Sequence, residues 1–482
     1  MRVGRREFLR RFSRAGGGAL LAPSMAGLAS WNCVSPDETR AATARRRNGL
    51  GANRYGALRP GQACPELHIP ADFHCVRLSV ALSPSPVRRD LAVPNAFDGM
   101  AAFALPNGNV RLIRNHEMVD RPENGRAIGS PYYDAKCSGG TTSLEVRITG
   151  SGTNLSVELV DEFVSLAGTH VNCAGGLTPW GSWLSCEETT NGHRQGFDQS
   201  HGYIFEVPAD ATGPVDPVPL RDMGRYIHEA VAVDPGTGFV YETEDAWYNP
   251  DNLESQPGAG LYRFIPNRRD ALAEGGRLSI LAVREQPNFV TARGMAPGTT
   301  VPVTWLPIED PDPASAETDS VTVFREGLSK GAAVFARLEG AFAADGGIYV
   351  VSTNGGNARA GQIFLYRPDG EDDGELTLVF ESPSNAVLDS PDNICVSPHG
   401  DLVLCEDGGG DQFIRCLDRE GAITDLVRNP ASMGRTPGEF AGGCFSPDGR
   451  VLFFNTQGGR DFDDTVASVT YAMWGPWSEA SG

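Results

Sequence analysis

The most regular feature of the chain is a short unit that recurs along most of its length. In each copy, apolar and polar residues alternate, a turn rich in Pro, Asp and Gly follows, and a second alternating stretch comes after the turn. Alternation with a period of two residues predicts half-buried β-strands, and two such strands around a tight turn predict a β-hairpin. Copies of the unit lie at residues 98–117, 173–188, 229–245, 339–356, 392–409 and 442–457. The sequence therefore predicts a repeated hairpin.

Most hairpins are followed by further strand-like stretches, such as GYIFEVP from residue 202 and GLYRFIP from residue 260. Two to four strands per unit, repeated along the chain, are typical of a propeller. We therefore expect an all-β fold, a six-bladed β-propeller in a single domain spanning 45–482. A sandwich without repeats is the alternative. An insertion near 267–338, with the strand GGRLSILAV and a short helix near 319–330, is expected on a loop at the rim.

The hairpins carry acidic residues at one edge. Because the start of the first strand and the end of the second lie side by side, both contribute to this edge. The first strands start at Asp98, Cys173, Glu229, Glu339, Asp392 and Gly442. A constant count of six residues from the turn glycines places Glu187, Glu244 and Glu406 at second-strand ends, with Thr353 and Asn455 in equivalent positions and Glu117 slightly further on.

Closing the blades into a ring would bring these anionic groups to one central funnel. Two unit charges about 4 Å apart repel by roughly 4 kcal/mol at an effective dielectric constant near 20, so the ring needs compensation. Bound multivalent cations are the simplest way to compensate this repulsion. Oxygen ligands favour calcium, while a single thiolate among carboxylates favours a softer ion such as iron. The alternative to a metal site is that these acidic side chains lie at strand ends and point into solvent. For Cys173, the alternative is a buried inert thiol or a disulfide partner.

Three further residues lie near this edge. Arg337 is two residues before Glu339, and its guanidinium offers the planar fork that phosphate oxygens match. A salt bridge to a neighbouring acid is the alternative role. His116 and His228 each precede an acid, so strand alternation turns them away from the funnel, and for each we expect either packing or a supporting contact behind the ligands.

Charge and composition exclude some classes of function. The 482 residues include 61 acidic and 41 basic side chains, a formal charge of −20, which argues against a nucleic-acid binder. After the N-terminus there is no apolar run long enough for a membrane helix, so we expect no integral membrane segment after processing. The chain has ten cysteines, of which Cys64 and Cys75 are a plausible disulfide pair in an oxidising compartment.

The residues at the N-terminus predict an export signal. Arg5-Arg6 is followed by Phe8 and Leu9 and by an uncharged stretch that ends in small residues. This pattern is typical of a twin-arginine signal, which we place with a linker at residues 1–44. The alternative is an amphipathic basic helix of the mature protein. We therefore expect a periplasmic or extracellular protein, with the twin-arginine export machinery as a partner.

Several stretches together resemble the PhoX family of alkaline phosphatases. They are RNHE from residue 114, NCAGGLTPWGSWLSCEE from 172, HEAVAVDP and YETED between 228 and 245, FARLEG from 335, and SPDN and CEDG between 390 and 408. The resemblance implies a six-bladed propeller, exported by the twin-arginine route, that hydrolyses phosphate monoesters at central iron and calcium ions. We expect a monomer acting on a small-molecule phosphate ester.

The resemblance also implies roles for individual residues. Cys173 would ligate iron, Arg337 would bind the substrate phosphate, and Glu339 would act beside them. The predicted metal ligands are Glu117, Cys173, Glu187, Glu188, Glu229, Glu244, Glu339, Asp392 and Glu406. The hairpin count favours Glu187 over Glu188, and both are retained.

The chain also departs from the family pattern. Asn354 and Asn455 stand where further acids are expected, and the sequence names no second phosphate-binding cation. The alternative functions are a calcium-dependent propeller esterase or lactonase, and a non-catalytic, metal-stabilised binding propeller.

Overall fold

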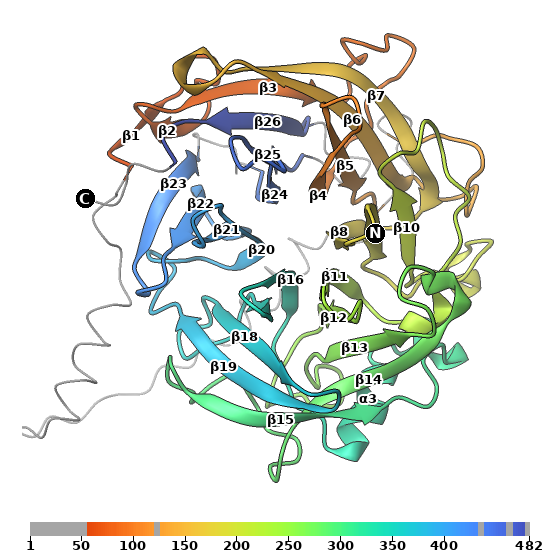
Figure 1. The fold of residues 1–482 in the computed structure, drawn as a ribbon. Helices are drawn as coiled ribbons and strands as arrows, with labels where there is room; N and C mark the ends of the chain where they lie inside the picture. The colour runs from red at the N-terminus through yellow and green to blue at the C-terminus, as the bar shows by residue number, and fades with distance from the viewer. Residues whose placement is uncertain (1–54, 120–125, 432–437, 459–465, 478–482) are drawn as a thin grey trace, which may run out of the picture. The chain divides into compact units, whose positions relative to one another are not determined.

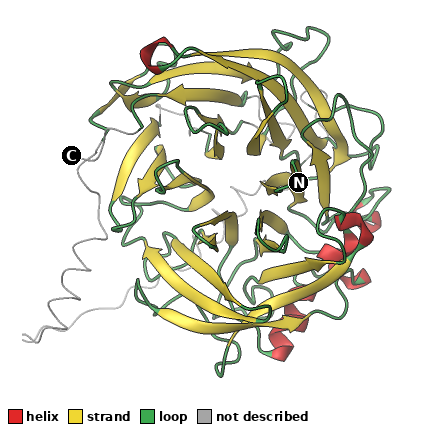
Figure 2. Cartoon of the chain, viewed as in Figure 1, coloured by secondary structure: helices red, strands yellow, loops and turns green. Residues whose placement is uncertain are grey.

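The computed structural model describes residues 55–119, 126–431, 438–458 and 466–477. The export signal predicted for residues 1–44 lies outside these ranges. The described chain is nearly all β (Figures 1 and 2), and none of its helices is long and apolar enough to cross a membrane.

Antiparallel hairpins form the inner ring of the fold. They are β4 (Phe97–Ala104) with β5 (Val110–His116), β8 (Asn172–Leu177) with β9 (Ser182–Glu187), β11 (His228–Val233) with β12 (Val240–Glu244), β16 (Leu338–Ala344) with β17 (Gly347–Ser352), β20 (Pro391–Val396) with β21 (Leu402–Glu406), and β24 (Phe440–Phe445) with β25 (Leu452–Thr456). The first strand of each hairpin contacts the first strand of the next, and β24 contacts β4. The hairpins therefore close into the ring seen in Figure 1, a propeller-like fold built on the predicted repeats.

Further strands extend each hairpin outward. They are β6 (Gly139–Thr149), β7 (Ser156–Thr169), β10 (Ile204–Pro208), β13 (Leu261–Pro266), β14 (Gly276–Val283), β15 (Thr300–Pro307), β18 (Gln362–Asp369), β19 (Asp373–Glu381), β22 (Gln412–Leu417), β23 (Ile423–Asn429) and β26 (Val469–Trp474). Short 3-10 helices lie between them at Gly152–Asn154, His193–Gln195, Arg221–Met223, Leu272–Glu274 and Ala314–Glu317.

The two ends of the described chain share sheets. Three strands come before the first hairpin: β1 (Leu58–Pro60), β2 (His68–Pro70) and β3 (His74–Val80). β3 pairs with β26 and so completes the sheet that begins with β24 and β25, while β2 pairs with β23. Cys64 and Cys75, the pair expected as a possible disulfide, are both buried free thiols joined by a hydrogen bond.

The region 267–338, expected as a rim insertion, contains regular structure. It includes the strands β14 and β15 and the helix α3 (Thr322–Lys330). β14 extends the sheet of β11, β12 and β13, and β15 pairs with both β14 and β19. This second pairing joins two neighbouring sheets into one of nine strands. The strand and the short helix expected there are both present.

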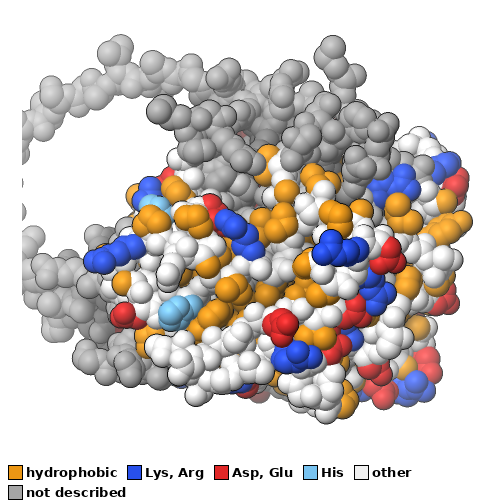
Figure 3. All heavy atoms as spheres, turned by 90° about the horizontal axis from the view of Figure 1, so that it is seen from above, with side chains coloured by type: hydrophobic (Ala, Val, Ile, Leu, Met, Phe, Trp, Pro, Cys, Tyr) orange, Lys and Arg blue, Asp and Glu red, His pale blue; other side chains and the backbone are white. Residues whose placement is uncertain are grey.

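Apolar side chains pack the sheets and the helix together. Phe264 on β13, Ile280 on β14 and Phe324 on α3 are fully buried in one cluster. Gly327 lets the helix approach closely, because a Cβ there would lie 2.8 Å from the side chain of Ile280. Full burial of a large apolar side chain stabilises a fold by about 1.5–3 kcal/mol. On the face shown in Figure 3, basic and acidic side chains are interspersed with apolar ones.

Candidate metal centre

Each inner hairpin has a β-bulge at the same place. In β11 and β12, His228 pairs with Glu244 and the next pair is Val231 with Glu242, so two residues of β11 lie opposite one of β12. The other inner hairpins show the same irregularity. A bulge bends its strand and redirects a side chain. The first residues of the bulges are Asp98, Cys173, Glu229, Glu339, Asp392 and Gly442.

The second residue of a bulge has little room for a side chain. A Cβ on Gly99 would lie 2.6 Å from the Cα of Ala174, and a Cβ on Gly340 would lie 2.5 Å from the carbonyl oxygen of Asp392. Real Cβ atoms do not approach other atoms this closely. The space is small because neighbouring inner strands are in contact at the bulges. The recurrent pair of an acid and a small residue in the repeats follows from this packing.

The bulges bring ligand atoms together at one end of the ring. These atoms lie within 4.8 Å of one another in three overlapping groups. The groups are Asp98 with Glu117 and Cys173, Cys173 with Glu188 and Glu229, and Glu229 with Glu339 and Asp392. Glu188 and Asp392 are partly exposed, and the other residues are buried. We call these seven residues the central cluster.

Hydrogen bonds connect part of the cluster. The thiol of Cys173 donates to Oε1 of Glu229 at 3.0 Å. The amide of Gln457 donates to Asp98 at 2.5 Å and to Glu117 at 2.8 Å. Oε2 of Glu229 is buried and accepts no hydrogen bond from the described residues. A buried carboxylate oxygen without a donor is costly, and a cation would satisfy it.

The electrostatics of the cluster also favour a bound cation. Burial and the carboxylates around Glu229, Glu339 foremost, raise the pKa of Glu229 well above its ordinary value. Burial, together with Asp98 and Glu229, raises the pKa of the Cys173 thiol in the same way. Multivalent cations would reverse both effects, since they stabilise the deprotonated forms. Carboxylate oxygens with one thiolate suit hard ions together with a softer one.

Arg337 lies beside the cluster and is held by two acids. Its Nε and Nη2 donate to the carboxylate of Asp245 at 2.7 and 2.9 Å, and Nη2 lies 2.5 Å from Oε1 of Glu339. The salt bridge to a neighbouring acid, given above as the alternative role of Arg337, is therefore present. Arg337 has a positive φ of 48°, which is uncommon for a residue other than glycine, and lies directly before β16.

Three predicted ligands lie outside the central cluster. Glu187 accepts hydrogen bonds from Nδ1 of His201 and from backbone N–H groups. Glu244 accepts from the N–H of Gly260 and the hydroxyl of Tyr262. Glu406 accepts from Arg415 and from the N–H of Asp389. Among the described residues, none of the three shares a ligand group with Cys173.

On the second strands, the residue that faces the central cluster comes one position later than the count of six residues from the turn glycines predicted. The last residues of the second strands are Glu187, Glu244 and Glu406, which pair with the residues before the bulges. The residues that face the cluster follow a strand end: Glu117 and Glu188 belong to the cluster, Asp245 binds Arg337, and Gln457 binds Asp98. The paired acids Glu187-Glu188 and Glu244-Asp245 carried this signal in the sequence.

Asp98, Asp245 and Gln457 were not among the predicted site residues, although Asp98 was recognised as a strand start. The two histidines turn away from the cluster, as alternation predicts. His116 contacts the carbonyl of Asn95, and His228 contacts that of Gly224.

The opposite side of the bulges is apolar. A cavity there is lined by residues that include Met100, Val231, Phe342, Ile394 and Cys444. Among the described residues, no Asp or Glu lines this cavity, in contrast to the central cluster.

The family model of alkaline phosphatase PhoX matches residues 81–459. The chain belongs to the PhoX family. The match spans the inner hairpins and the whole central cluster. The resemblance drawn from the sequence motifs is thus confirmed. A search of curated proteins found no match.

One solved structure supports the same fold. The structure described as Pseudomonas fluorescens PhoX in complex with vanadate, a transition state analogue, is 18% identical, with a TM-score of 0.63, covering 89% of this chain and 97% of that chain. A putative gluconolactonase is 13% identical, with a TM-score of 0.41, covering 87% and 98%. Periplasmic gluconolactonase from Pseudomonas aeruginosa is 13% identical, with a TM-score of 0.35, covering 77% and 85%.

Proposed function

We propose that this PhoX family member hydrolyses phosphate monoesters at iron and calcium ions held by the central cluster. The observation that carries the proposal is the convergence of six carboxylates and one thiol from neighbouring hairpins on one end of the ring. The vanadate complex of the Pseudomonas fluorescens protein, a transition state analogue bound to the same fold, supports phosphoryl chemistry.

The donor atoms fit the proposed ions. Cys173 belongs to two of the ligand groups and provides the one sulfur, so we place iron beside it. Glu229, Glu339 and Asp392 form an all-oxygen group, which suits calcium. Binding would remove the proton that Cys173 shares with Glu229, because thiolate is the form that ligates metals.

Arg337 is the group on this chain that would bind the substrate phosphate. Asp245 holds its Nε and Nη2, which fixes the plane of the guanidinium beside Glu339. A fixed cation next to the reacting group stabilises the negative charge that builds up in a transition state. When bound, the metal ions would act as Lewis acids on phosphoryl oxygens.

Substitutions at two of these residues test the function. We expect Cys173→Ala and Arg337→Ala each to lower kcat/KM for a phosphate monoester by about 100-fold or more. Cys186→Ala is the matched control, since Cys186 is a fully buried thiol that lies in the apolar core. Elemental analysis should find iron and calcium in the wild type and less iron in Cys173→Ala. Near-wild-type turnover in both site variants would disprove the assignment.

We also propose export by the twin-arginine pathway to the periplasm or beyond, on the evidence of Arg5-Arg6 and the uncharged stretch that follows. Replacing both arginines with lysine should retain the protein in the cytoplasm. Localisation by cell fractionation checks this, and unchanged export of that variant would contradict it.

A further inference from the structure

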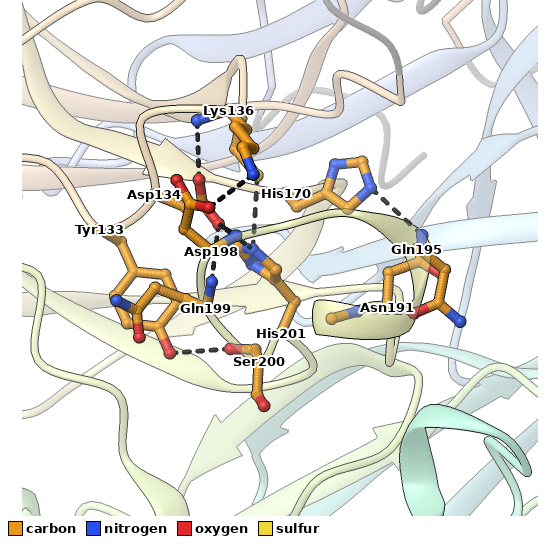
Figure 4. A network of polar contacts seen from close by, with 12 residues as sticks. Tyr133, Asp134, Lys136, His170, Asn191, Gln195, Asp198, Gln199, Ser200 and His201 are labelled. Atoms are coloured by element: carbon orange, nitrogen blue, oxygen red, sulfur yellow. Dashed lines mark hydrogen bonds and ion pairs between the residues drawn. The ribbon is translucent and has the colours of Figure 1, made fainter.

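A second group of metal-ligating side chains lies outside the central cluster. Asp134 and Cys137 come from the segment between β5 and β6, and His201 comes from the segment between β9 and β10. Nε2 of His201 lies 3.4 Å from Sγ of Cys137 and 3.6 Å from Oδ2 of Asp134. All three residues are buried. Figure 4 shows Asp134 and His201 pointing toward one another across the two segments.

These separations match the edges of a tetrahedral zinc site. Zinc bonds of about 2.3 Å to sulfur and about 2.0–2.2 Å to nitrogen or oxygen, at a tetrahedral angle, place neighbouring ligand atoms about 3.4–3.6 Å apart. An imidazole, a thiolate and a carboxylate are also donor types that zinc accepts together. The pairs His201 with Cys137 and His201 with Asp134 would therefore need only small shifts to hold the ion.

The histidine is oriented as metal-bound histidines are. Its Nδ1–H donates to Oε1 of Glu187 at 2.7 Å, so the other ring nitrogen, Nε2, faces Cys137 and Asp134. A carboxylate that accepts from one nitrogen fixes the tautomer and makes the other nitrogen a better ligand. Glu187, which the central cluster does not use, has this role here.

Asp134 is held in place by backbone donors. Its Oδ1 accepts from the N–H of Lys136 at 2.7 Å, and its Oδ2 accepts from the N–H groups of Asp198 and Gln199 at 2.7 and 2.9 Å. Burial opposes ionisation, but these hydrogen bonds and His201 hold the pKa of Asp134 well below its ordinary value. Oδ1 accepts only one of these hydrogen bonds and therefore has lone-pair capacity left for a cation.

His201 lies between two buried carboxylates, with Nδ1 at 2.7 Å from Oε1 of Glu187 and Nε2 at 3.6 Å from Oδ2 of Asp134. Without a metal ion, these carboxylates favour a proton on each nitrogen of the ring. A divalent ion would displace two protons, one from Nε2 of His201 and one from Sγ of Cys137, whose atoms lie in contact. Exchange of two protons for one divalent cation leaves the net charge of the buried group unchanged.

We propose that Asp134, Cys137 and His201 form a second metal site, separate from the central cluster, that binds a zinc ion. Three protein ligands leave one tetrahedral position for a water molecule or another small ligand. The rings of Tyr133, His170 and Phe197 pack around His201 and limit access of water. The ion would join loops of two adjacent sheets and stabilise the end of the ring beside Glu188.

Elemental analysis of the full-length protein tests the site. We expect about one zinc ion per chain in the wild type after incubation with zinc and removal of loosely bound metal. Cys137→Ala and Asp134→Asn should retain much less zinc. Cys173→Ala and Cys186→Ala should retain it, since Cys173 belongs to the central cluster and Cys186 to the apolar core. Asp134→Asn preserves side-chain volume, so it remains informative if Cys137→Ala folds poorly.

Cobalt substitution identifies the ligand directly. Bound Co²⁺ with a thiolate ligand absorbs in the near ultraviolet through sulfur-to-metal charge transfer. The band should persist in Cys173→Ala and disappear in Cys137→Ala, which separates this site from the central cluster. Absence of zinc from the wild type, or retention of both zinc and the cobalt band in Cys137→Ala, would overturn the proposal and leave a hydrogen-bonded network without metal. Loss of phosphatase activity in Cys173→Ala would not bear on it.

Discussion

Glu187 and Glu188 are neighbours in the sequence, but their carboxylates belong to different clusters. Glu187 accepts a hydrogen bond from Nδ1 of His201 at 2.7 Å, while Glu188 lies in one ligand group with Cys173 and Glu229. The end of β9 therefore serves the central cluster and the proposed zinc site at once.

The same conservative change, Glu to Gln, should affect a different metal site at each of these two residues. Glu188→Gln should lower the iron and calcium content and the phosphatase activity, because it removes a charged ligand. Glu187→Gln should weaken zinc retention by about 10- to 100-fold, as loss of a carboxylate behind a metal-bound histidine does elsewhere. Metal titrations of both variants, with activity measured in parallel, check this. Equal losses of iron in the two variants would contradict the division.

Asp245 should act on catalysis through Arg337. Asp245→Asn keeps the size of the side chain but weakens its hold on the guanidinium of Arg337, which donates two hydrogen bonds to the Asp245 carboxylate. We expect KM for a phosphate monoester to rise by about tenfold with a smaller change in kcat, since charge-assisted bonds of this kind are worth roughly 1.5–3 kcal/mol.

The comparison variant is Arg337→Ala, which should lose more activity than Asp245→Asn. The double variant should be no worse than Arg337→Ala alone, because the two residues act as one unit. Additive losses in steady-state kinetics would show that Asp245 has a separate role.

The small residues of the bulges should be intolerant of substitution. Gly340→Ala would place a Cβ 2.5 Å from the carbonyl oxygen of Asp392, and overpacking of this kind costs about 1–3 kcal/mol. Gly409→Ala is the control, since a Cβ there meets nothing within 4 Å. Urea unfolding should show a clear loss of stability for the first variant only. The metal content of Gly340→Ala should fall too, as Glu339 and Asp392 move apart.

Glu244 should make stability depend on pH. Burial raises its pKa from the ordinary 4.5 to about 8, although Gly260 and Tyr262 donate hydrogen bonds to it. The folded state therefore keeps a proton that the unfolded state loses. Below pH 4.5 both states are protonated and there is no penalty, and stability falls between pH 4.5 and about 8, by about 1.4 kcal/mol per pH unit at most.

Glu244→Gln removes this titration. The difference in unfolding free energy between wild type and variant should change across the same window, with the variant relatively more stable at pH 8 than at pH 5. Denaturant unfolding at both pH values measures it. A constant difference would mean that Glu244 is already ionised in the folded protein.

Much of the fold was predictable because turn chemistry and alternation are local. The hairpins around PGTG, at residues 235–238, and PHGD, at residues 398–401, are both present. The bulges were not predictable, because an extra residue in one strand leaves the alternation nearly intact. This explains the shift by one residue from Glu188 to Glu187. Pairing of β15 with β19 depends on contacts between sheets, which the sequence does not display.

The proposed zinc site could not be predicted from the sequence for a different reason. Asp134 and Cys137 have a recognisable spacing, but His201 follows more than sixty positions later in an irregular segment. Nothing in the local sequence indicates that these segments meet. The central cluster was accessible because its residues repeat in register, and the second group was not because it occurs once.

The pairing of β3 with β26 bears on how the protein is made. β3 precedes the first inner hairpin, yet its partner lies at Val469–Trp474, so this sheet of the ring cannot be completed until residues 469–474 have been synthesised. Contacts this distant along the chain form slowly. Assembly of the central cluster, which draws on hairpins all around the ring, is thus a late event, and nascent chains should have no complete metal centre.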